Sequence, residues 1–371
     1  MSASGRLLVT SIVRHADLRQ ASGFASVLEL DSGRILMRSP VPESTRRARD
    51  PNPRGGLRGA RGIAFCGNKL ALANTERVLI FDSNWRLKNE ITHPLMAGIH
   101  DLLADPEGIW VTCTSADLLV RVSWEGDLVS VWEWRADARL RTQLGFKQLA
   151  RVNRGIDFRD PESSRSAPRN LAHLNSIHHS GDRILVSLGR VIPPHSYKRL
   201  VLAGWMGRIS QHMGVRRPST PKSGSQPGGI PVKLQPGSCF ALLELDEHLQ
   251  ANLLFSQRDT QVPNHNVAIF KERILYNDTN QDEVVSLDLE KGNEQRLPIP
   301  GAPGFLRGMA LSGCEAFVGS QAPAAVYQVD LESWKIKREF LLDGISGESV
   351  YGVALVPDVF TDPPAQLDLL S

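Results

Sequence analysis

The chain has 371 residues, of which 41% are apolar and 22% are charged, and its formal net charge is +3. This composition excludes a disordered chain, and the length allows either two ordinary domains or one large β or α/β domain. The four cysteines lie far apart without a CxxC pair, which argues against a disulfide framework or a cysteine zinc site. The first apolar run, "LLVT", is shorter than a signal-peptide core, and no run approaches the roughly 18 apolar residues of a membrane span. We therefore expect a cytoplasmic protein without a membrane span.

The predicted elements are short strands that recur in a fixed order along the chain. "RLLVTSIVR" near the N-terminus predicts one strand, and "ASVLELDSGRILMRS" predicts two more joined by a tight turn. "RGIAFCGNKLALAN" at 61–74 begins a repeat, and "RGMALSGCEAFVGS" at 307–320 is almost its copy. The same frame fits "HDLLADPEGIWVTCTS" from 100, "NSIHHSGDRILVSLG" from 175 and "HNVAIFKERILYNDTN" from 265. "YGVALVP" from 351 begins a sixth copy that stops after one strand.

These repeats predict an all-β fold, a single six-bladed β-propeller. Each full copy continues into two further strands, and the spacing without insertions is about 40 residues, the period of a four-stranded blade. The sixth copy lacks three strands, and the N-terminus supplies three. We therefore predict a last blade made of one C-terminal strand and three N-terminal strands, which closes the ring and leaves no unpaired sheet edge. The predicted domain covers residues 1–371.

Three insertions interrupt the repeat, at residues 40–60, 136–172 and 190–237. Because successive strands of a blade are antiparallel, the predicted register places all three on one face, where we expect a lid over the mouth of the central channel. The insertions carry an excess of 15 positive charges, against +3 for the whole chain, which would attract anions to that face. A solvated, arginine-rich surface is the alternative. Val201, Trp205 and Ile209 have helical spacing and predict a lid helix rather than a membrane-surface helix.

The first residue of each inner strand should point into the channel mouth on the same face. In blade order these residues are Arg61, His100, Asn175, His265, Arg307 and Tyr351. All six carry hydrogen-bonding or ionisable groups, which are costly to bury without partners. We therefore expect this ring to hold water, a metal or a ligand, and to be the functional site.

One arc of the ring is a candidate metal site. His100, Asn175 and His265 come from consecutive blades, and His173 lies two residues before Asn175. Imidazole and amide ligands suit a divalent transition metal such as iron, manganese or zinc. Histidines that only hydrogen-bond to water are the alternative, because the ring contains no carboxylate. His178 and His179, farther along the same strand, are expected to be packed or solvent-facing.

The other arc is cationic and phenolic. Arg61 and Arg307 flank Tyr351, and paired guanidinium groups suit a carboxylate, sulfate or phosphate. We expect Arg61, Arg307 and Asn175 to bind the substrate. His100, His265 and Tyr351 are the expected catalytic residues, through acid–base chemistry.

The six copies, the polar ring and the blade completed from both termini resemble the gluconolactonase and strictosidine synthase-like group of six-bladed propellers. Lactonases of that group bind calcium through Glu, Asn and Asp, and only Asn175 matches that pattern here. The resemblance therefore implies the architecture rather than calcium-dependent lactone hydrolysis. The strand starts "RGxA", "HNxA" and "YGVA" also resemble an uncharacterised bacterial propeller family of conserved hypothetical proteins, which implies no chemistry.

Three classes of function fit these features. An enzyme acting on an anionic small molecule, such as a carboxylated saccharide, would neutralise its carboxylate with Arg61 and Arg307 while a histidine or Tyr351 exchanges protons, as in lyases and isomerases. A bound metal would instead allow hydrolysis or oxidation. The second class is a non-catalytic anion-binding module, and the third is a scaffold that docks a protein partner on its basic lid face. The sequence has no nucleotide-cofactor motif, and we do not expect a nucleic-acid partner.

Overall fold

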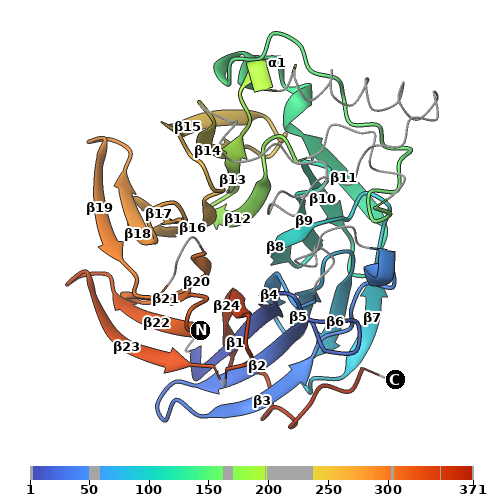
Figure 1. Cartoon of the computed structure of the whole chain (residues 1–371), viewed down its shortest axis with the longest axis vertical. Coiled ribbons are helices and arrows are strands. Elements are labelled where there is room, and N and C mark those ends of the chain that lie inside the picture. Colours follow the sequence, from blue (N-terminus) through green and yellow to red (C-terminus); the bar gives the residue numbers. More distant parts are fainter. Residues whose placement is uncertain are drawn as a thin grey trace, which may run out of the picture.

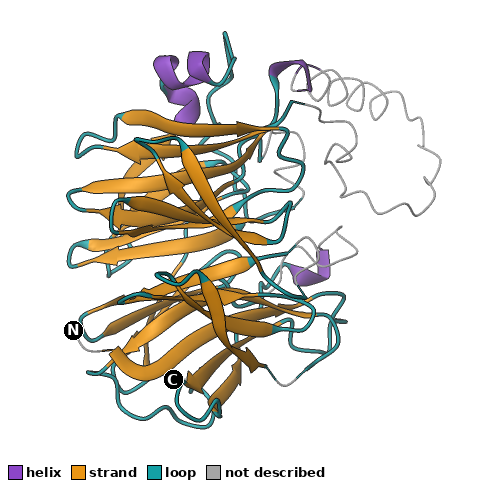
Figure 2. Cartoon of the chain, turned by 90° about the vertical axis from the view of Figure 1, so that its left-hand side faces the viewer, coloured by secondary structure: helices purple, strands orange, loops and turns teal. Residues whose placement is uncertain are grey.

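A computed structural model describes residues 3–49, 59–161, 170–196, 198, 237–301, 305–342 and 344–369 and confirms the six-bladed β-propeller. Six four-stranded antiparallel sheets follow one another around a ring in sequence order (Figure 1). Seen from the side, strands make up most of the ring and helical turns lie outside the blades (Figure 2). Among the described residues, no helix is long and apolar enough to cross a bilayer.

The first five blades each consist of four consecutive strands. Blade 1 holds β4 (Ile63–Cys66), β5 (Lys69–Ala73), β6 (Val78–Asp82) and β7 (Leu87–Ile91). Blade 2 holds β8 (Ile99–Asp105), β9 (Gly108–Cys113), β10 (Leu118–Val122) and β11 (Leu128–Glu133). Blade 3 holds β12 (Leu174–Ser180), β13 (Arg183–Val191), β14 (Cys239–Leu245) and β15 (Ala251–Arg258). Blade 4 holds β16 (His265–Phe270), β17 (Arg273–Asp278), β18 (Glu283–Asp288) and β19 (Asn293–Pro298). Blade 5 holds β20 (Arg307–Ser312), β21 (Glu315–Gly319), β22 (Ala325–Asp330) and β23 (Lys335–Leu341).

Both ends of the chain build the sixth blade, as the repeat count predicts. Its strand order is β24 (Glu348–Pro357), β1 (Ala3–Val13), β2 (Gly23–Glu29) and β3 (Ile35–Pro40). β1 and β24 pair antiparallel, with Leu8 opposite Ala354, and Figure 1 shows red β24 beside blue β1. The antiparallel ladder therefore joins the two ends of the chain and closes the ring.

The helical elements lie in the insertions. A 3-10 turn, η1 (Arg47–Arg49), belongs to the first insertion, and η2 (Trp134–Ala136) and α1 (Ala138–Gln143) lead into the second. The side chain of Asp137 caps α1 by accepting a hydrogen bond from the Leu140 amide. The predicted lid helix at Val201, Trp205 and Ile209 lies outside the described residues.

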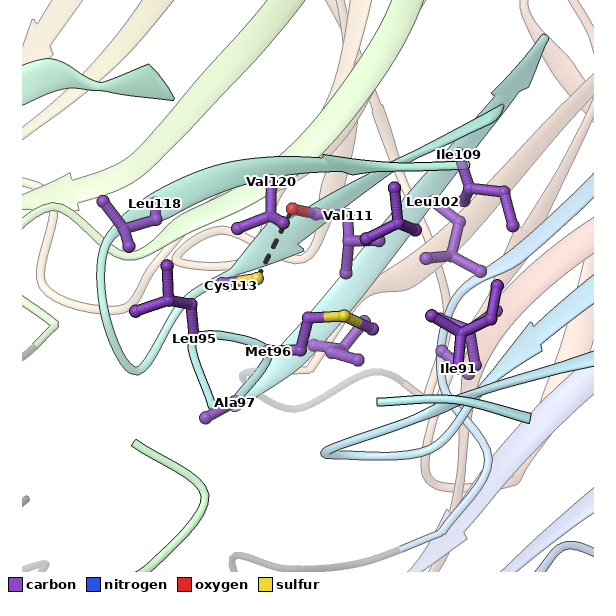
Figure 3. Packing of buried hydrophobic residues seen from close by; sticks show 14 of the residues in the cluster. Ile91, Leu95, Met96, Ala97, Leu102, Ile109, Val111, Cys113, Leu118 and Val120 are labelled. Carbon is purple, nitrogen blue, oxygen red and sulfur yellow. Dashed lines mark hydrogen bonds between the residues drawn. The ribbon is translucent and has the colours of Figure 1, made fainter. Parts of the chain in front are cut away.

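The apolar core is divided among the interfaces between blades. Each of the six interfaces between neighbouring blades contains one buried apolar cluster. Figure 3 shows the cluster between blades 1 and 2, where Ile91 and Met96 lie near Val111 and Ile109. Middle strands are buried on both faces, as in β9, whereas the outer strand β7 alternates between half-buried and exposed residues. Each blade is thus held by both neighbours, which gives a rigid ring of inner strands.

A C-terminal tail reinforces the closed ring after β24. Phe360 contacts the rings of Phe65 and Trp85 edge-on, at centroid distances of 5.0 and 5.3 Å. The indole of Trp85 donates a hydrogen bond to the Thr361 carbonyl at 2.9 Å, and Arg6 donates to the Phe360 carbonyl at 2.9 Å. The tail therefore ties blade 6 to blade 1, a contact that the repeat pattern did not predict.

Candidate functional site

Six side chains from six different blades meet at the inner ends of the blades. The set consists of Arg61 before β4, His100 in β8, His173 before β12, His265 in β16, Arg307 in β20 and Tyr351 in β24. We call these six residues the axial cluster. Five of them are the ring residues that the repeat register indicates, and His173 takes the place of Asn175.

Three histidines form one side of the axial cluster. The rings of His100 and His265 are nearly parallel with centroids 6.0 Å apart, and His173 lies edge-on to them at 4.9 and 5.6 Å. One ring nitrogen of each histidine lies within 4.8 Å of those of the other two. The described part of the chain contains no other group of three such side chains. The spacing suits three imidazole ligands around one metal ion.

Hydrogen bonds at Nδ1 set the proton positions of these rings. Nδ1 of His100 lies 2.7 Å from the Gly98 carbonyl, which only accepts, so Nδ1 carries the proton. Nδ1 of His173 donates in the same way to the Asn170 side-chain oxygen at 2.8 Å. Nε2 is then left unprotonated in both rings.

His265 follows the same pattern through a hydroxyl group. Its Nδ1 lies 3.1 Å from the Thr279 hydroxyl, which itself donates to the Leu306 carbonyl at 3.4 Å, so the hydroxyl accepts from Nδ1. Among the described residues, Nε2 of His173 and Nε2 of His265 are buried and have no hydrogen-bond partner. Buried unprotonated nitrogens without a donor are unfavourable, and an electron-pair acceptor between the rings would satisfy them. The three histidines therefore fit a divalent transition metal.

Burial and neighbouring cations keep the three imidazoles neutral. Desolvation lowers the pKa of His100, His173 and His265 well below the usual 6.5, and the positive charge of Arg307 lowers all three further. Arg61 adds to the effect at His100 and His173. Neutral imidazole is the form that binds a metal, so the site is prepared for one at neutral pH.

Two arginines and a tyrosine form the other side of the axial cluster. Arg61 donates through one terminal nitrogen to the Tyr351 hydroxyl at 3.1 Å and to the Ile99 carbonyl at 3.2 Å. The guanidinium carbon of Arg307 lies 4.7 Å from the centre of the Tyr351 ring and 4.5 Å from that of Phe305. The Tyr351 ring is also 5.5 Å from His100, so the cationic side and the histidine side adjoin. This arrangement suits an anion held next to the histidines.

Asn175, which we expected among the ligands, is occupied by protein contacts. Its amide nitrogen donates to the Asn264 carbonyl at 2.6 Å, and its oxygen accepts from the Ser187 hydroxyl at 2.7 Å. A Cβ at Gly189 would come within 2.5 Å of the Asn175 amide, so a glycine is needed beside it. Asn175 therefore joins blades 3 and 4 next to the cluster, with both ends of its amide engaged.

Close contacts between inner strands explain the repeated "RG", "HN" and "YG" starts. A Cβ at Gly352 would lie 2.7 Å from the Arg61 carbonyl, and one at Gly308 would lie 2.9 Å from Val353. Gly308 and Asn266 also adopt positive φ angles of 77° and 51°, which glycine and asparagine tolerate best. In β16 and β20 the second residue therefore turns the backbone next to His265 and Arg307.

A buried ion pair positions His173. The Asp117 carboxylate accepts from Arg135 at 2.8 Å and from the amides of Leu171 and Ala172, at the two ends of the second insertion. His173 follows directly and adopts a φ of 48°. Asp117 and Arg135 are buried. We call this ion pair and its two amide contacts the Asp117 clasp, and it fixes the backbone directly before His173.

Several supporting residues escaped the sequence reasoning. Thr114 contacts Nδ1 of His100 at 2.9 Å and, like Thr279, comes directly after the second strand of its blade. The sequence therefore contains a pattern that could have indicated both threonines. In blades 2 and 4, whose inner strands carry a histidine of the cluster, a threonine follows the second strand. The contact of Asn170 with His173 spans an irregular segment and has no such signal.

Two insertions lead directly into the axial cluster. The first ends at Ala60, before Arg61, and the second ends at Ala172, before His173. Arg46 of the first insertion pairs with Asp157 of the second at 3.1 Å and with Glu76 at 3.5 Å. A lid over the channel mouth remains a prediction, since much of the third insertion lies outside the described residues.

Comparisons with known proteins support the architecture alone. No family model matches the chain, and no curated protein does. A protein of unknown function from Bacteroides caccae matches with a TM-score of 0.51 and 11% identity, over 95% of this chain and 98% of that one. A chain of a nidogen/laminin complex matches with a TM-score of 0.52 and 8% identity, over 96% and 100%. A virginiamycin B lyase from Staphylococcus aureus reaches 0.43 with 9% identity, over 77% and 71%. The narrower resemblance to the gluconolactonase and strictosidine synthase-like group stays a prediction.

Proposed function

We propose that the protein is a metal-dependent enzyme that acts on a small anionic, carboxylated molecule at the axial cluster. His100, His173 and His265 hold a divalent transition metal, and Arg61 and Arg307 bind the carboxylate. The observation that carries the proposal is the convergence of three neutral imidazoles beside two guanidinium groups.

The proposed ligand set is the expected set of His100, His173, Asn175 and His265 without Asn175. The Asn175 amide is left out because it already bonds to Asn264 and Ser187. His100 and His265, expected as proton carriers, serve as ligands because their Nδ1 atoms are held by protein acceptors.

Tyr351 is then the group that exchanges a proton with the substrate. Arg61 donates to the phenol oxygen, so the phenol's own proton can be given to a bound molecule. When bound, the metal supplies Lewis-acid activation of the substrate or of water, which suits hydrolytic, lyase or oxidative chemistry. The guanidinium groups neutralise the carboxylate and orient it within reach of Tyr351.

The first test is metal content and affinity. Protein purified with a chelator should regain about one equivalent of zinc, manganese or iron, measured by elemental analysis. His265→Ala should weaken zinc binding by about 100-fold or more, which exceeds the 10- to 100-fold typical of a lost supporting hydrogen bond. Thr279→Val, which keeps the imidazole of His265 and removes the hydroxyl group that supports it, should fall in that lower range.

The matched control is His179→Ala, since His179 is an exposed histidine of β12 outside the axial cluster. It should bind zinc as the wild type does. The metal-loaded wild type should then turn over a member of a panel of carboxylated sugars and hydroxy acids, and Tyr351→Phe should reduce kcat more than it raises KM. Metal binding that survives loss of His265, or is equally reduced by His179→Ala, contradicts the site. Binding of an anion without turnover of any panel member would favour the non-catalytic module.

A further inference from the structure

The charge balance of the axial cluster constrains what binds there. Its six side chains are three histidines, two arginines and a tyrosine, so the axial cluster contains two cations and no carboxylate. A divalent metal on three neutral ligands, next to Arg61 and Arg307, would place four positive charges in one small region. Such a concentration of buried positive charge is unfavourable without a counter-charge.

The acidic residue that is nearest in sequence to a member of the axial cluster does not supply that counter-charge. Asp101 follows His100, but its carboxylate accepts from the Leu102 amide at 3.0 Å and from Ser176 and the Ile177 amide at 3.3 Å. Its hydrogen bonds therefore go to these neighbours and not to the axial cluster. A negatively charged ligand would supply the counter-charge.

The two guanidinium groups are arranged to receive such a ligand. Both stack on aromatic faces, with Arg61 5.1 Å and Arg307 4.7 Å from the Tyr351 ring centre. Stacking uses the face of a guanidinium, whereas an oxyanion binds its N–H edge. Among the described residues, Nε of Arg307 is buried and has no hydrogen-bond partner. An oxyanion would supply the missing acceptor.

We propose that a small oxyanion bridges the metal on the three histidines to the guanidinium groups of Arg61 and Arg307, so that metal and anion bind as a coupled pair. This inference rests on the proposed function and identifies the ligand group that the metal and the arginines share. The Tyr351 ring centre lies 5.5 Å from that of His100 and 4.7 Å from the guanidinium carbon of Arg307, so the histidine side and the arginine side adjoin the same ring. A coupled pair must be reciprocal, because each ligand strengthens the other by the same factor.

The coupling can be measured with zinc as the probe. Zinc affinity of the metal-free protein is determined by competition with a chromophoric chelator, in perchlorate as a weakly binding anion and then with added lactate, acetate, phosphate or sulfate. At least one oxyanion should tighten zinc binding by about tenfold or more, within the usual range for coupled sites. Zinc should tighten binding of that oxyanion by the same factor in calorimetry. Comparison of the arms shows whether a carboxylate or a phosphate-type group is preferred.

Variants separate the bridge from the metal site. Arg307→Met and Arg61→Met should still bind zinc in perchlorate. Their zinc affinity should exceed that of the wild type, because a repelling charge is gone. Both variants should lose most of the increase in zinc affinity that the oxyanion causes. Arg34→Met, an exposed arginine of the β2–β3 turn, is the matched control and should keep the full effect. In cobalt-substituted protein, the oxyanion should shift the visible absorption of the metal, which a ligand bound by the arginines alone would not do.

The possible failures are distinct. Zinc affinity that is the same in every anion, or coupling that survives loss of both arginines, contradicts the bridging oxyanion but not the three-histidine metal site. A cobalt spectrum unchanged by a bound oxyanion also overturns it. Failure of the wild type to bind any transition metal, with or without an oxyanion, overturns both the bridge and the proposed function.

Discussion

Burial of the three axial imidazoles makes stability depend on pH even without a metal. Their pKa values are lowered in the folded protein, whereas an unfolded chain titrates near 6.5. Below pH 6.5 the unfolded state therefore binds more protons, and the stability of the fold is lost as the pH falls toward the folded-state pKa values. Each buried imidazole that stays neutral lowers the free energy of unfolding by about 1.4 kcal/mol for every pH unit by which the pH falls in that window.

We expect the urea midpoint of the chelator-treated protein to fall steadily between pH 6.5 and 5. His265→Gln should make this fall shallower, since one of the neutral buried rings is gone. His248→Gln, at an exposed position, should leave the slope unchanged. Equal slopes for the wild type and His265→Gln would show that His265 is protonated alike in the folded and unfolded states.

Most of the axial cluster could be predicted from single residues, because the repeat register fixes which side chain begins each inner strand. That register brought Arg61, His100 and Tyr351 together correctly. It fails at blade 3, where His173 precedes β12 with a φ of 48° and joins the cluster in place of Asn175. Local conformation of this kind depends on tertiary contacts, so the sequence suggested His173 only as an additional ligand.

At the scale of elements, the clasp at Asp117 controls both stability and the position of a ligand. Asp117→Ala leaves the buried Arg135 without its carboxylate, and breaking a buried pair in this way costs about 3–5 kcal/mol. Urea unfolding should show that loss, while Asp127→Ala at an exposed position should stay within about 0.5 kcal/mol of the wild type.

Asp117→Ala should also weaken zinc binding, because His173 directly follows the two residues whose amides donate to Asp117. Asp117→Asn, which keeps one acceptor oxygen, should lose less of both properties. A destabilised Asp117→Ala protein with unchanged zinc affinity would mean that His173 is positioned by its own contact to Asn170. The repeat predicts the strands around Asp117. The hydrogen bond between Asp117 and Leu171 joins residues 54 positions apart, and no repeating sequence pattern indicates it.

At the scale of the whole molecule, the C-terminal tail adds to the closure of the ring. Phe360 is buried against Phe65 and Trp85, so Phe360→Ala should destabilise the fold by about 3–5 kcal/mol. Val359→Ala, at the exposed neighbouring position, should have little effect. Thermal and urea unfolding measure both. Equal stability of the two variants would show that the β1–β24 ladder alone holds the ring closed.

Closure by both ends of the chain also sets an order in time. β1 ends at Val13 and its partner β24 begins only at Glu348, so almost the entire protein is translated between them. At about 5–20 residues per second, the N-terminal strands of the nascent chain wait roughly 15 to 70 s on the ribosome for their partner strand. Tyr351 belongs to β24, so no ligand can meet a complete axial cluster before that strand is synthesised. During the wait β1 has an open edge, and a chaperone or a premature pairing partner would find the chain most accessible there.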